Sequence, residues 1–164
     1  MNVRPIVHMH PSGLRVQAAL DEAGVATRIV ETIDPAPTAA SAAAQLGIEI
    51  GQVANSLVFV VDERPILVMA SGGHRVDIDR LAAHFGANSA TRANADFVRR
   101  HTGQPIGGVA PVGHPSALTT IVDRALATWP EIWAAGGHPH YVFATTFDDL
   151  VRMTRGTPLD VGVA

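Results

Sequence analysis

The sequence predicts a single α+β domain, and three observations support this prediction. The chain has 164 residues, of which 47% are hydrophobic and 16% charged, so it can bury one substantial core. Helical patterns and short apolar strands mingle along the chain, and two of the strands lie close enough to form a hairpin. No linker, repeat or low-complexity block divides the sequence, so one domain is expected over residues 1–164.

The chain is expected to begin with a helix and a strand. Ser12 is a suitable N-cap for a helix that ends at Gly24. A strand is expected over residues 25–31, because β-branched residues there favour extended backbone. The residues of the helix that are expected to face the core are Leu14, Val16, Ala19 and Leu20.

A second helix and a β-hairpin follow. Thr38 caps an alanine-rich helix over residues 39–46, and Gly47 closes it. The apolar runs 56–61 and 66–70, joined by a polar turn, predict a hairpin. Because both runs are almost continuously apolar, the sheet is expected to be buried on both faces.

The remaining elements are placed by capping residues and by glycine and proline. Asp77 is expected to cap a helix that ends at Phe85, Asn94 a helix over 95–102, and Thr145 or Thr146 a helix over 147–153. Strands are expected over 119–123, 131–134 and 140–144, with a helical turn at 124–128. The segment 155–164 is expected to be loose.

Composition excludes several kinds of chemistry. The chain has no cysteine, which excludes disulfides and thiolate sites and is consistent with a reducing cytoplasm. It has no lysine, so a side-chain Schiff base is excluded. The net charge of −3 gives no general basic field, so DNA is not an expected partner. No apolar run approaches the length that crosses a bilayer, and no membrane partner is expected.

The segment from Gln104 to Pro115 is the strongest candidate for a functional loop. It contains three glycines and three prolines in twelve residues, an arrangement that is typical of a rigid bend. Gly107 and Gly108 leave two backbone amides unshielded, and such amides can stabilise an oxyanion or a phosphate. The alternative is a purely structural turn that joins two strands.

Histidines offer weaker candidates. His114 lies within the glycine–proline segment, and His140 lies on a predicted strand, so both are candidates for a polar pocket. The pairs His8-Met9-His10 and His138-Pro139-His140 have metal-ligand spacing but lack a third ligand nearby. No metal site and no cofactor are therefore expected. Nucleotide-binding glycine motifs and a serine nucleophile elbow are absent from the sequence.

Several segments in order resemble the YbaK/EbsC family, which includes free-standing aminoacyl-tRNA deacylases and the editing domain of bacterial prolyl-tRNA synthetases. These segments are His10-Pro11-Ser12, residues 38–59, the hairpin, residues 72–87 and residues 106–111. The resemblance covers about residues 11–159. It implies an α+β fold with a central mixed, largely antiparallel sheet flanked by helices.

The resemblance also implies a set of site residues. Gly107 to Pro111 matches the family's G-x-x-x-P loop, and His140 resembles a histidine of the synthetase-inserted domains. Asn55 stands where the family usually has lysine, so any compensating charge is expected from Arg75 or Arg64. Gly107, Gly108 and Asn55 are the expected catalytic residues; the expected substrate-binding residues are Pro111, Val109, Ser71, His140, His114 and Arg75.

The function that the resemblance implies is hydrolysis of the ester on a mischarged tRNA, with tRNA-Pro-type substrates. The expected partners are the aminoacyl-adenosine at the tRNA 3′ end and a prolyl-tRNA synthetase. Because Asn55 replaces lysine, a catalytically silent module that binds aminoacyl or nucleotide ends, or a synthetase, is the alternative. A small-molecule hydrolase that uses the same pocket is a third hypothesis.

Overall fold

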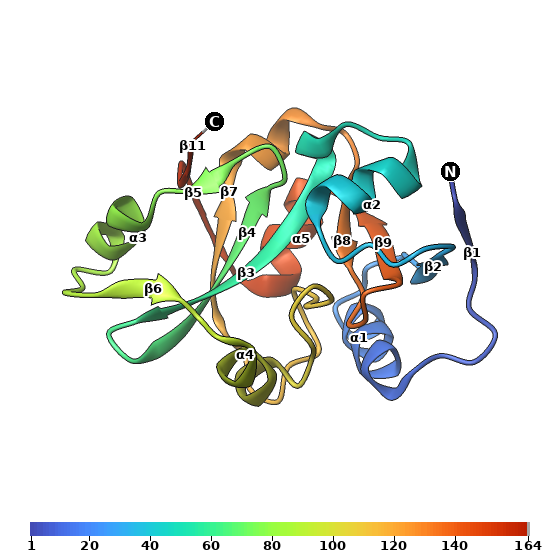
Figure 1. The fold of residues 1–164 in the computed structure, drawn as a ribbon, viewed down its shortest axis with the longest axis horizontal. Helices are drawn as coiled ribbons and strands as arrows, with labels where there is room; N and C mark the ends of the chain where they lie inside the picture. The colour runs from blue at the N-terminus through green and yellow to red at the C-terminus, as the bar shows by residue number, and fades with distance from the viewer. Residues whose placement is uncertain (164) are drawn as a thin grey trace.

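The computed structural model describes residues 1–163 and contains one large sheet with helices on both faces (Figure 1). The order across the large sheet is β1 (Val3–Pro5), β2 (Val30–Thr32), β9 (Tyr141–Thr145), β8 (Ile132–Ala135), β3 (Val53–Val61), β4 (Arg64–Ser71), β7 (Thr119–Asp123) and β10 (Thr157–Leu159). A further strand of this sheet, β6 (Ala90–Arg92), pairs with the edge of β3. A separate two-stranded sheet is formed by β5 (Arg75–Val76) and β11 (Gly162–Val163).

The sheet is mixed, and antiparallel pairs predominate. Strand β3 is antiparallel to β4 and β6. Strand β9 is antiparallel to β8 and β2, and β2 is antiparallel to β1. Parallel pairs join β3 to β8, β4 to β7 and β7 to β10. The predicted α+β fold with a mixed, largely antiparallel sheet is therefore confirmed.

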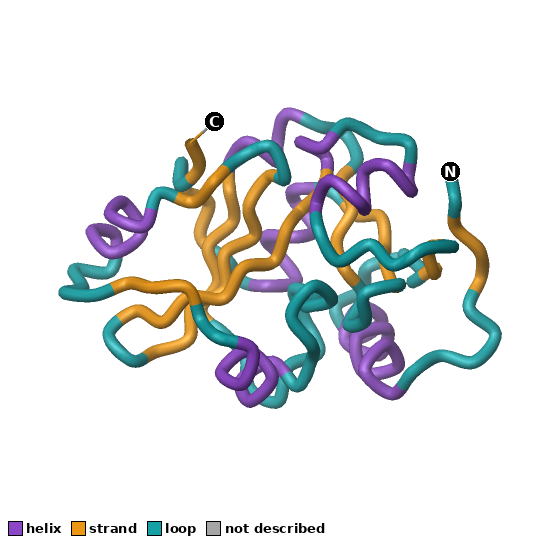
Figure 2. The backbone as a smooth tube through the Cα atoms, viewed as in Figure 1, coloured by secondary structure: helices purple, strands orange, loops and turns teal. Residues whose placement is uncertain are grey.

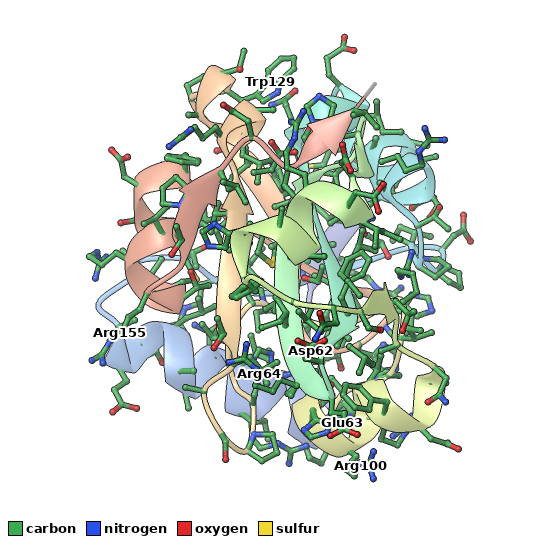
Figure 3. All side chains as sticks on the ribbon, turned by 90° about the vertical axis from the view of Figure 1, so that its left-hand side faces the viewer. Asp62, Glu63, Arg64, Arg100, Trp129 and Arg155 are labelled. Atoms are coloured by element: carbon green, nitrogen blue, oxygen red, sulfur yellow. The ribbon has the colours of Figure 1, made fainter. Side chains whose placement is uncertain are left out.

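The β3–β4 hairpin is closed by a two-residue turn at its exposed tip. Asp62 and Glu63 both have positive φ, at 45° and 68°, as a tight hairpin turn with right-handed strand twist requires. The Asp62 carboxylate accepts hydrogen bonds from the amides of Asn88 and Ser89, which holds the turn against the next segment. Figure 3 shows Asp62, Glu63 and Arg64 together at this tip, with Trp129 at the opposite end of the molecule.

The helices divide between the two faces of the sheet. Helices α1 (Pro11–Glu22), α4 (Ala95–Thr102) and α5 (Phe147–Thr154) pack in one hydrophobic cluster with Val58, Met69 and Phe143. Helix α3 (Ile78–His84) covers Phe59 and Val68 on the other face, where α2 (Ala39–Leu46) packs on Val53. Two short 3₁₀ helices, η1 (Ile50–Gln52) and η2 (Arg124–Thr128), complete the elements. Strands β3 and β4 are therefore buried on both faces, as predicted.

Helix capping agrees with the sequence at four helices and differs at the first. Thr38, Asp77, Asn94 and Thr146 cap α2, α3, α4 and α5, and each side chain accepts a hydrogen bond from a backbone amide of the first turn. The predicted cap of α1 is wrong, because its cap is His10, while Ser12 is buried and donates its hydroxyl proton to the Gly137 carbonyl. Leu14 was expected in the core but is 56% exposed.

The ends of the chain are more ordered than the sequence predicted. The segment after Arg155 is not loose, because β10 adds to β7 in parallel and β11 pairs with β5. Val161 is fully buried between these two strands, so apolar burial explains the order. The predicted strand over 25–31 is limited to β2, and β1 and β6 were not predicted. No helix within residues 1–163 is both long and apolar enough to cross a membrane.

Candidate functional site

A cavity opens where strand β3 changes partner along one edge. Val53 and Ala54 pair with β8 on this edge, and Phe59 to Val61 pair with β6. No strand among the described residues pairs with Asn55 to Leu57 there, so the sheet is split at this point. The split exposes the edge of a central strand, whose backbone groups a ligand can reach.

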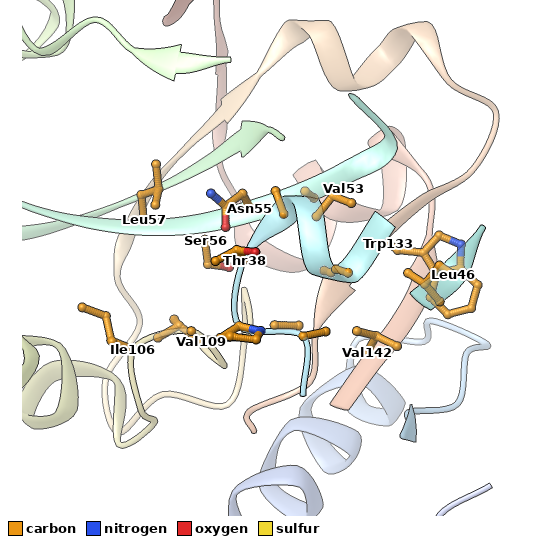
Figure 4. Close-up of a pocket in the computed structure, with 18 of the residues that line it drawn as sticks. Thr38, Leu46, Val53, Asn55, Ser56, Leu57, Ile106, Val109, Trp133 and Val142 are labelled. Carbon is orange, nitrogen blue, oxygen red and sulfur yellow. The ribbon is translucent and has the colours of Figure 1, made fainter. Parts of the chain in front are cut away.

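The cavity has a volume of about 390 Å³ and is mainly apolar. Its walls are β3, α2 and the segment before it, parts of β8 and β9, and the loop between α4 and β7. Figure 2 shows this loop as a long connection without helix or strand. Figure 4 shows Asn55 and Leu57 on one side of the cavity and Ile106 and Val109 on the other. The small apolar residues of the lining are Ala36, Ala39, Ala42, Ala54, Ala134 and Ala135, and the larger ones include Leu46, Val53, Trp133 and Val142.

The loop that closes the cavity contains a tight turn over Pro105 to Gly108. The Gly108 amide donates to the Pro105 carbonyl at 3.0 Å, and Gly107 has φ +87°. A positive φ at the third residue is typical of a type II turn and favours glycine. A Cβ at Gly107 would also lie 3.0 Å from the Cβ of Pro37, so this position admits little more than glycine.

A buried glutamine holds the rest of this loop in shape. Gln104 is 1% exposed, and its side-chain oxygen accepts a hydrogen bond from the Ala110 amide at 2.7 Å. Its side-chain nitrogen donates to the carbonyls of Val112 and Gly113. One side chain thus satisfies backbone groups that the loop would otherwise bury unpaired, which fixes the direction of the turn. The rigid bend predicted from glycine and proline therefore also depends on Gln104.

Of the two amides that the double glycine suggested, that of Gly107 is available and that of Gly108 is not. The Gly108 amide is engaged by Pro105, so the prediction that it faces a ligand is wrong for this structure. Gly108 is required by packing, because a Cβ there would lie 2.6 Å from the carbonyl carbon of His138. The amides of Gly107 and Val109 donate to no backbone carbonyl among residues 1–163, and both residues line the cavity. These two amides can serve as donors to an oxyanion.

The polar side chains of the cavity lining belong to Thr38, Asn55, Ser56 and Arg92. Asn55 lines the cavity as predicted, and Arg92 is the charged side chain among the lining residues that the structure describes. Arg92 reaches this position because β6 aligns it with Phe59 of β3. The compensating charge was expected from Arg75 or Arg64, but Arg64 lies over the ring of Phe85 and lines no described cavity. Arg92 lies on β6, a strand that the sequence did not predict.

Three of the predicted substrate-binding residues lie elsewhere. Pro111 and His114 line a different cavity beside α1 and α5. Burial lowers the pKa of His114, and its hydrogen bond to the Ala110 carbonyl partly opposes this shift. Ser71 is buried, and its hydroxyl donates to the Gly51 carbonyl. These positions indicate structural roles for the three residues.

His140 and its neighbours form a histidine cluster outside the cavity. Nδ1 of His140 lies 3.0 Å from the Thr32 carbonyl, and the ring of His138 lies between those of His10 and His140 at 5.6 and 5.7 Å. Burial lowers the pKa of His138, and positive charge on His10 and His140 lowers it further, while Glu31 opposes the shift. Among the described residues, no group of three or more histidine or acidic side chains is placed to hold a metal ion.

Arg75 lies in a second cavity, of about 730 Å³, that adjoins the first. The two cavities share Asn55, Leu57 and Arg92. Of the predicted site residues, Asn55, Gly107 and Val109 therefore meet in one cavity, and Arg75 lies next to them through the shared wall.

Comparisons with known proteins place the chain in a family. Residues 33–153 match the family model of the aminoacyl-tRNA editing domain. The proline–tRNA ligase of Streptococcus sanguinis is 32% identical over 114 residues, which are 70% of this chain and 17% of that protein. The ligase of Bacillus cytotoxicus is 31% identical over 127 residues, which are 77% of this chain and 21% of that protein. The chain thus spans about a fifth or less of the length of these curated relatives.

Solved structures give the same result over the whole chain. A crystal structure of a candidate trans-editing enzyme for prolyl-tRNA synthetase has a TM-score of 0.89 and 37% identity, covering 96% of this chain and 100% of that one. The structure of the hypothetical protein APE2540 has a TM-score of 0.84 and 27% identity, covering 91% of this chain and 99% of that one. The chain belongs to the aminoacyl-tRNA editing domain family.

Proposed function

We propose that this chain hydrolyses the ester between a mischarged amino acid and the 3′ end of a tRNA, with tRNA-Pro-type substrates as its targets. Membership of the editing family supports this activity, and the similarity to proline–tRNA ligases supports the choice of tRNA. The observation that carries the proposal is the position of two unengaged amides, from Gly107 and Val109, opposite Asn55 in one largely apolar cavity.

The proposed chemistry is attack of water on the ester carbonyl. The amino-acid side chain occupies the apolar part of the cavity, and the carbonyl oxygen faces the two amides, which stabilise the negative charge that develops on it. The C–O bond to the ribose then breaks, the ribose oxygen takes up a proton, and the free amino acid leaves. No histidine, aspartate or glutamate of the described residues lines this cavity. The neighbouring ribose hydroxyl of the substrate therefore orients the water.

Asn55 and Arg92 divide the role that a lysine has in the family. Asn55 can donate and accept hydrogen bonds at the ester but carries no charge. Arg92 brings a permanent positive charge to the wall that both cavities share, where the phosphate backbone of a tRNA end approaches.

Asn55 also supports a second candidate function, a module that binds an aminoacyl end without cleaving it. A panel of mischarged tRNAs, assayed for ester loss with and without a prolyl-tRNA synthetase, separates the two functions. The hydrolase accelerates ester loss on some members of the panel, whereas the binding module protects the ester or leaves it unchanged.

The Asn55→Lys variant tests whether this position acts at the ester. We expect the variant to raise the rate or to change the preferred amino acid, because lysine adds a charge beside the reacting carbonyl. If Asn55→Lys leaves the rate unchanged for every ester that the wild-type protein hydrolyses, Asn55 takes no part in the reaction.

A further inference from the structure

The second cavity continues the first in the direction of β5 and α3. A ligand whose ester lies beside Asn55 can extend into it, because Asn55, Leu57 and Arg92 belong to both walls. The volume of about 730 Å³ exceeds the 390 Å³ of the first cavity. The added space suits a larger group than an amino acid.

His74 lines the second cavity in a fixed orientation. Its Nδ1 lies 2.9 Å from Oδ2 of Asp123, which is 1% exposed and also accepts hydrogen bonds from the amides of Ser71 and Ala125. An aspartate held in this way accepts the Nδ1 proton, so Nε2 is the ring nitrogen that is left for a ligand. Gly162 packs against the ring, since a Cβ there would lie 2.2 Å from Nδ1.

The charges of the second cavity suit a ligand with one negative charge and several hydroxyl groups. Arg75 and Arg92 line it and form no ion pair among the described residues. Asp77 and Asp79 also line it, and their negative charges disfavour a pyrophosphate or triphosphate. A ribose with a single phosphodiester matches this balance, because its hydroxyls can donate to carboxylates and histidine while the phosphate meets arginine.

We propose that the second cavity binds the ribose and phosphate of the nucleotide that precedes the ester-bearing adenosine. In this site Nε2 of His74 accepts a hydrogen bond from the ribose 2′-hydroxyl, and Arg75 and Arg92 contact the phosphodiester. Because the 2′-hydroxyl distinguishes RNA from DNA, His74 selects ribose at this position. The inference rests on the proposed function, since it places the ester at Asn55.

The test compares three aminoacyl esters: of adenosine, of the trinucleotide CCA, and of CCA with a deoxyribose at the middle nucleotide. For the wild-type protein we expect kcat/KM to fall about five-fold when the 2′-hydroxyl is removed, the size of one net hydrogen bond. His74→Phe should abolish this difference; the adenosine ester, which lacks this nucleotide, gives the reference rate of each protein. Equal rates on the two trinucleotides for the wild-type protein, or an undiminished difference between them in His74→Phe, would overturn the proposal.

The phosphate contact has its own readout and control. Arg75→Gln should weaken binding of uncharged CCA and reduce the slope of log affinity against log salt by about 0.7, as expected for one lost contact to a single strand. The control is Arg28→Gln, which removes an exposed arginine that lines none of the described cavities. An unchanged slope in Arg75→Gln, or the same change in both variants, contradicts the phosphate contact.

Failure of the proposed function can be told apart from failure of this inference. If the wild-type protein hydrolyses no ester, the hydrolase is excluded, but binding of the two uncharged trinucleotides still tests the second cavity. Tighter binding of the ribose form, lost in His74→Phe, supports the site. Equal affinity for the two forms, or no binding of either, overturns it.

Discussion

Phe59 and Arg92 are Cα partners in the antiparallel pair of β3 and β6, and the guanidinium carbon of Arg92 lies 5.7 Å from the centre of the Phe59 ring. This stacking holds the long arginine side chain beside the wall that the two cavities share. A strand of three residues thus delivers a positive charge to the cavity wall that Asn55 also lines.

Removal of the Arg92 charge should impair hydrolysis more than stability. We expect Arg92→Gln to lower kcat/KM on aminoacyl-tRNA by about ten- to one-hundred-fold, the size of a lost charge-assisted hydrogen bond. Arg64→Gln is the matched control, because Arg64 also lies over an aromatic ring, that of Phe85, but lines no described cavity. Steady-state rates and melting temperatures of both variants check the prediction, and equal rates for the two would contradict it.

The two adjacent glycines should respond differently to alanine. Gly107→Ala places a side chain at φ +87° beside Pro37, which costs about 1–3 kcal/mol and displaces the backbone of the loop. We expect a melting temperature lower by several degrees and a hydrolysis rate lower by up to about 100-fold.

Gly108→Ala should act mainly on stability, because its Cβ would lie 2.6 Å from backbone of His138 and the loop must move. We expect it to lower the melting temperature more than Gly107→Ala does. Thermal unfolding and single-turnover rates of the two variants separate these effects. Retention of the full rate by Gly107→Ala would exclude the Gly107 amide from the reaction.

The size of the amino acid that is accepted should depend on α2. Ala42 is 5% exposed and lines the first cavity, so Ala42→Leu fills part of the space for the amino-acid side chain. We expect this variant to lose activity toward larger apolar amino acids while it retains most of its activity toward alanine esters. Ala44→Leu on the same helix is the control, since Ala44 is exposed and does not line the cavity. A panel of esters that shows the same loss for every amino acid would exclude Ala42 from the side-chain pocket.

Stability should decrease in mild acid because of His114. Burial lowers the pKa of this side chain in the folded protein below its ordinary value of 6.5. The unfolded chain therefore binds more protons, so the contribution of His114 to stability is complete above pH 6.5 and is lost as the pH falls through the folded pKa. We expect urea midpoints measured between pH 8 and pH 5 to fall less for His114→Gln than for the wild-type protein. His84→Gln, which changes an exposed histidine at the end of α3, is the control.

Local sequence signals were sufficient for the elements that carry their own caps or turns. Asn94 and Gly103 bound α4 as predicted, and the apolar runs of the β3–β4 hairpin were assigned correctly. Short strands that depend on partners far along the chain were missed, because β1, β6, β10 and β11 contain only two or three residues each. Their pairing is decided by tertiary contacts, of which burial of Val161 is an example.

The candidate site was predicted in part for the same reason. Asn55, Gly107 and Val109 belong to segments with recognisable motifs, and the structure places all three in one cavity. The prediction that the Gly108 amide faces a ligand was wrong. The sequence shows that no side chain shields this amide, but it does not show that the Pro105 carbonyl accepts a hydrogen bond from it. The position of Arg92 depends on the register of β6 on β3. The hydrogen bond between His74 and Asp123 joins residues that are 49 apart in the chain. No local sequence pattern reveals either feature.

If the cavity between β3 and the Gly107 loop hydrolyses an aminoacyl ester, single-turnover hydrolysis of tRNA-Pro charged in turn with each small apolar amino acid will reveal it. For at least one amino acid, we expect the wild-type protein to accelerate ester loss by about 100-fold or more over buffer, and Gly107→Ala to remove most of this acceleration. Ester loss at the buffer rate for every amino acid, from a folded protein that binds the charged tRNA, would exclude this activity.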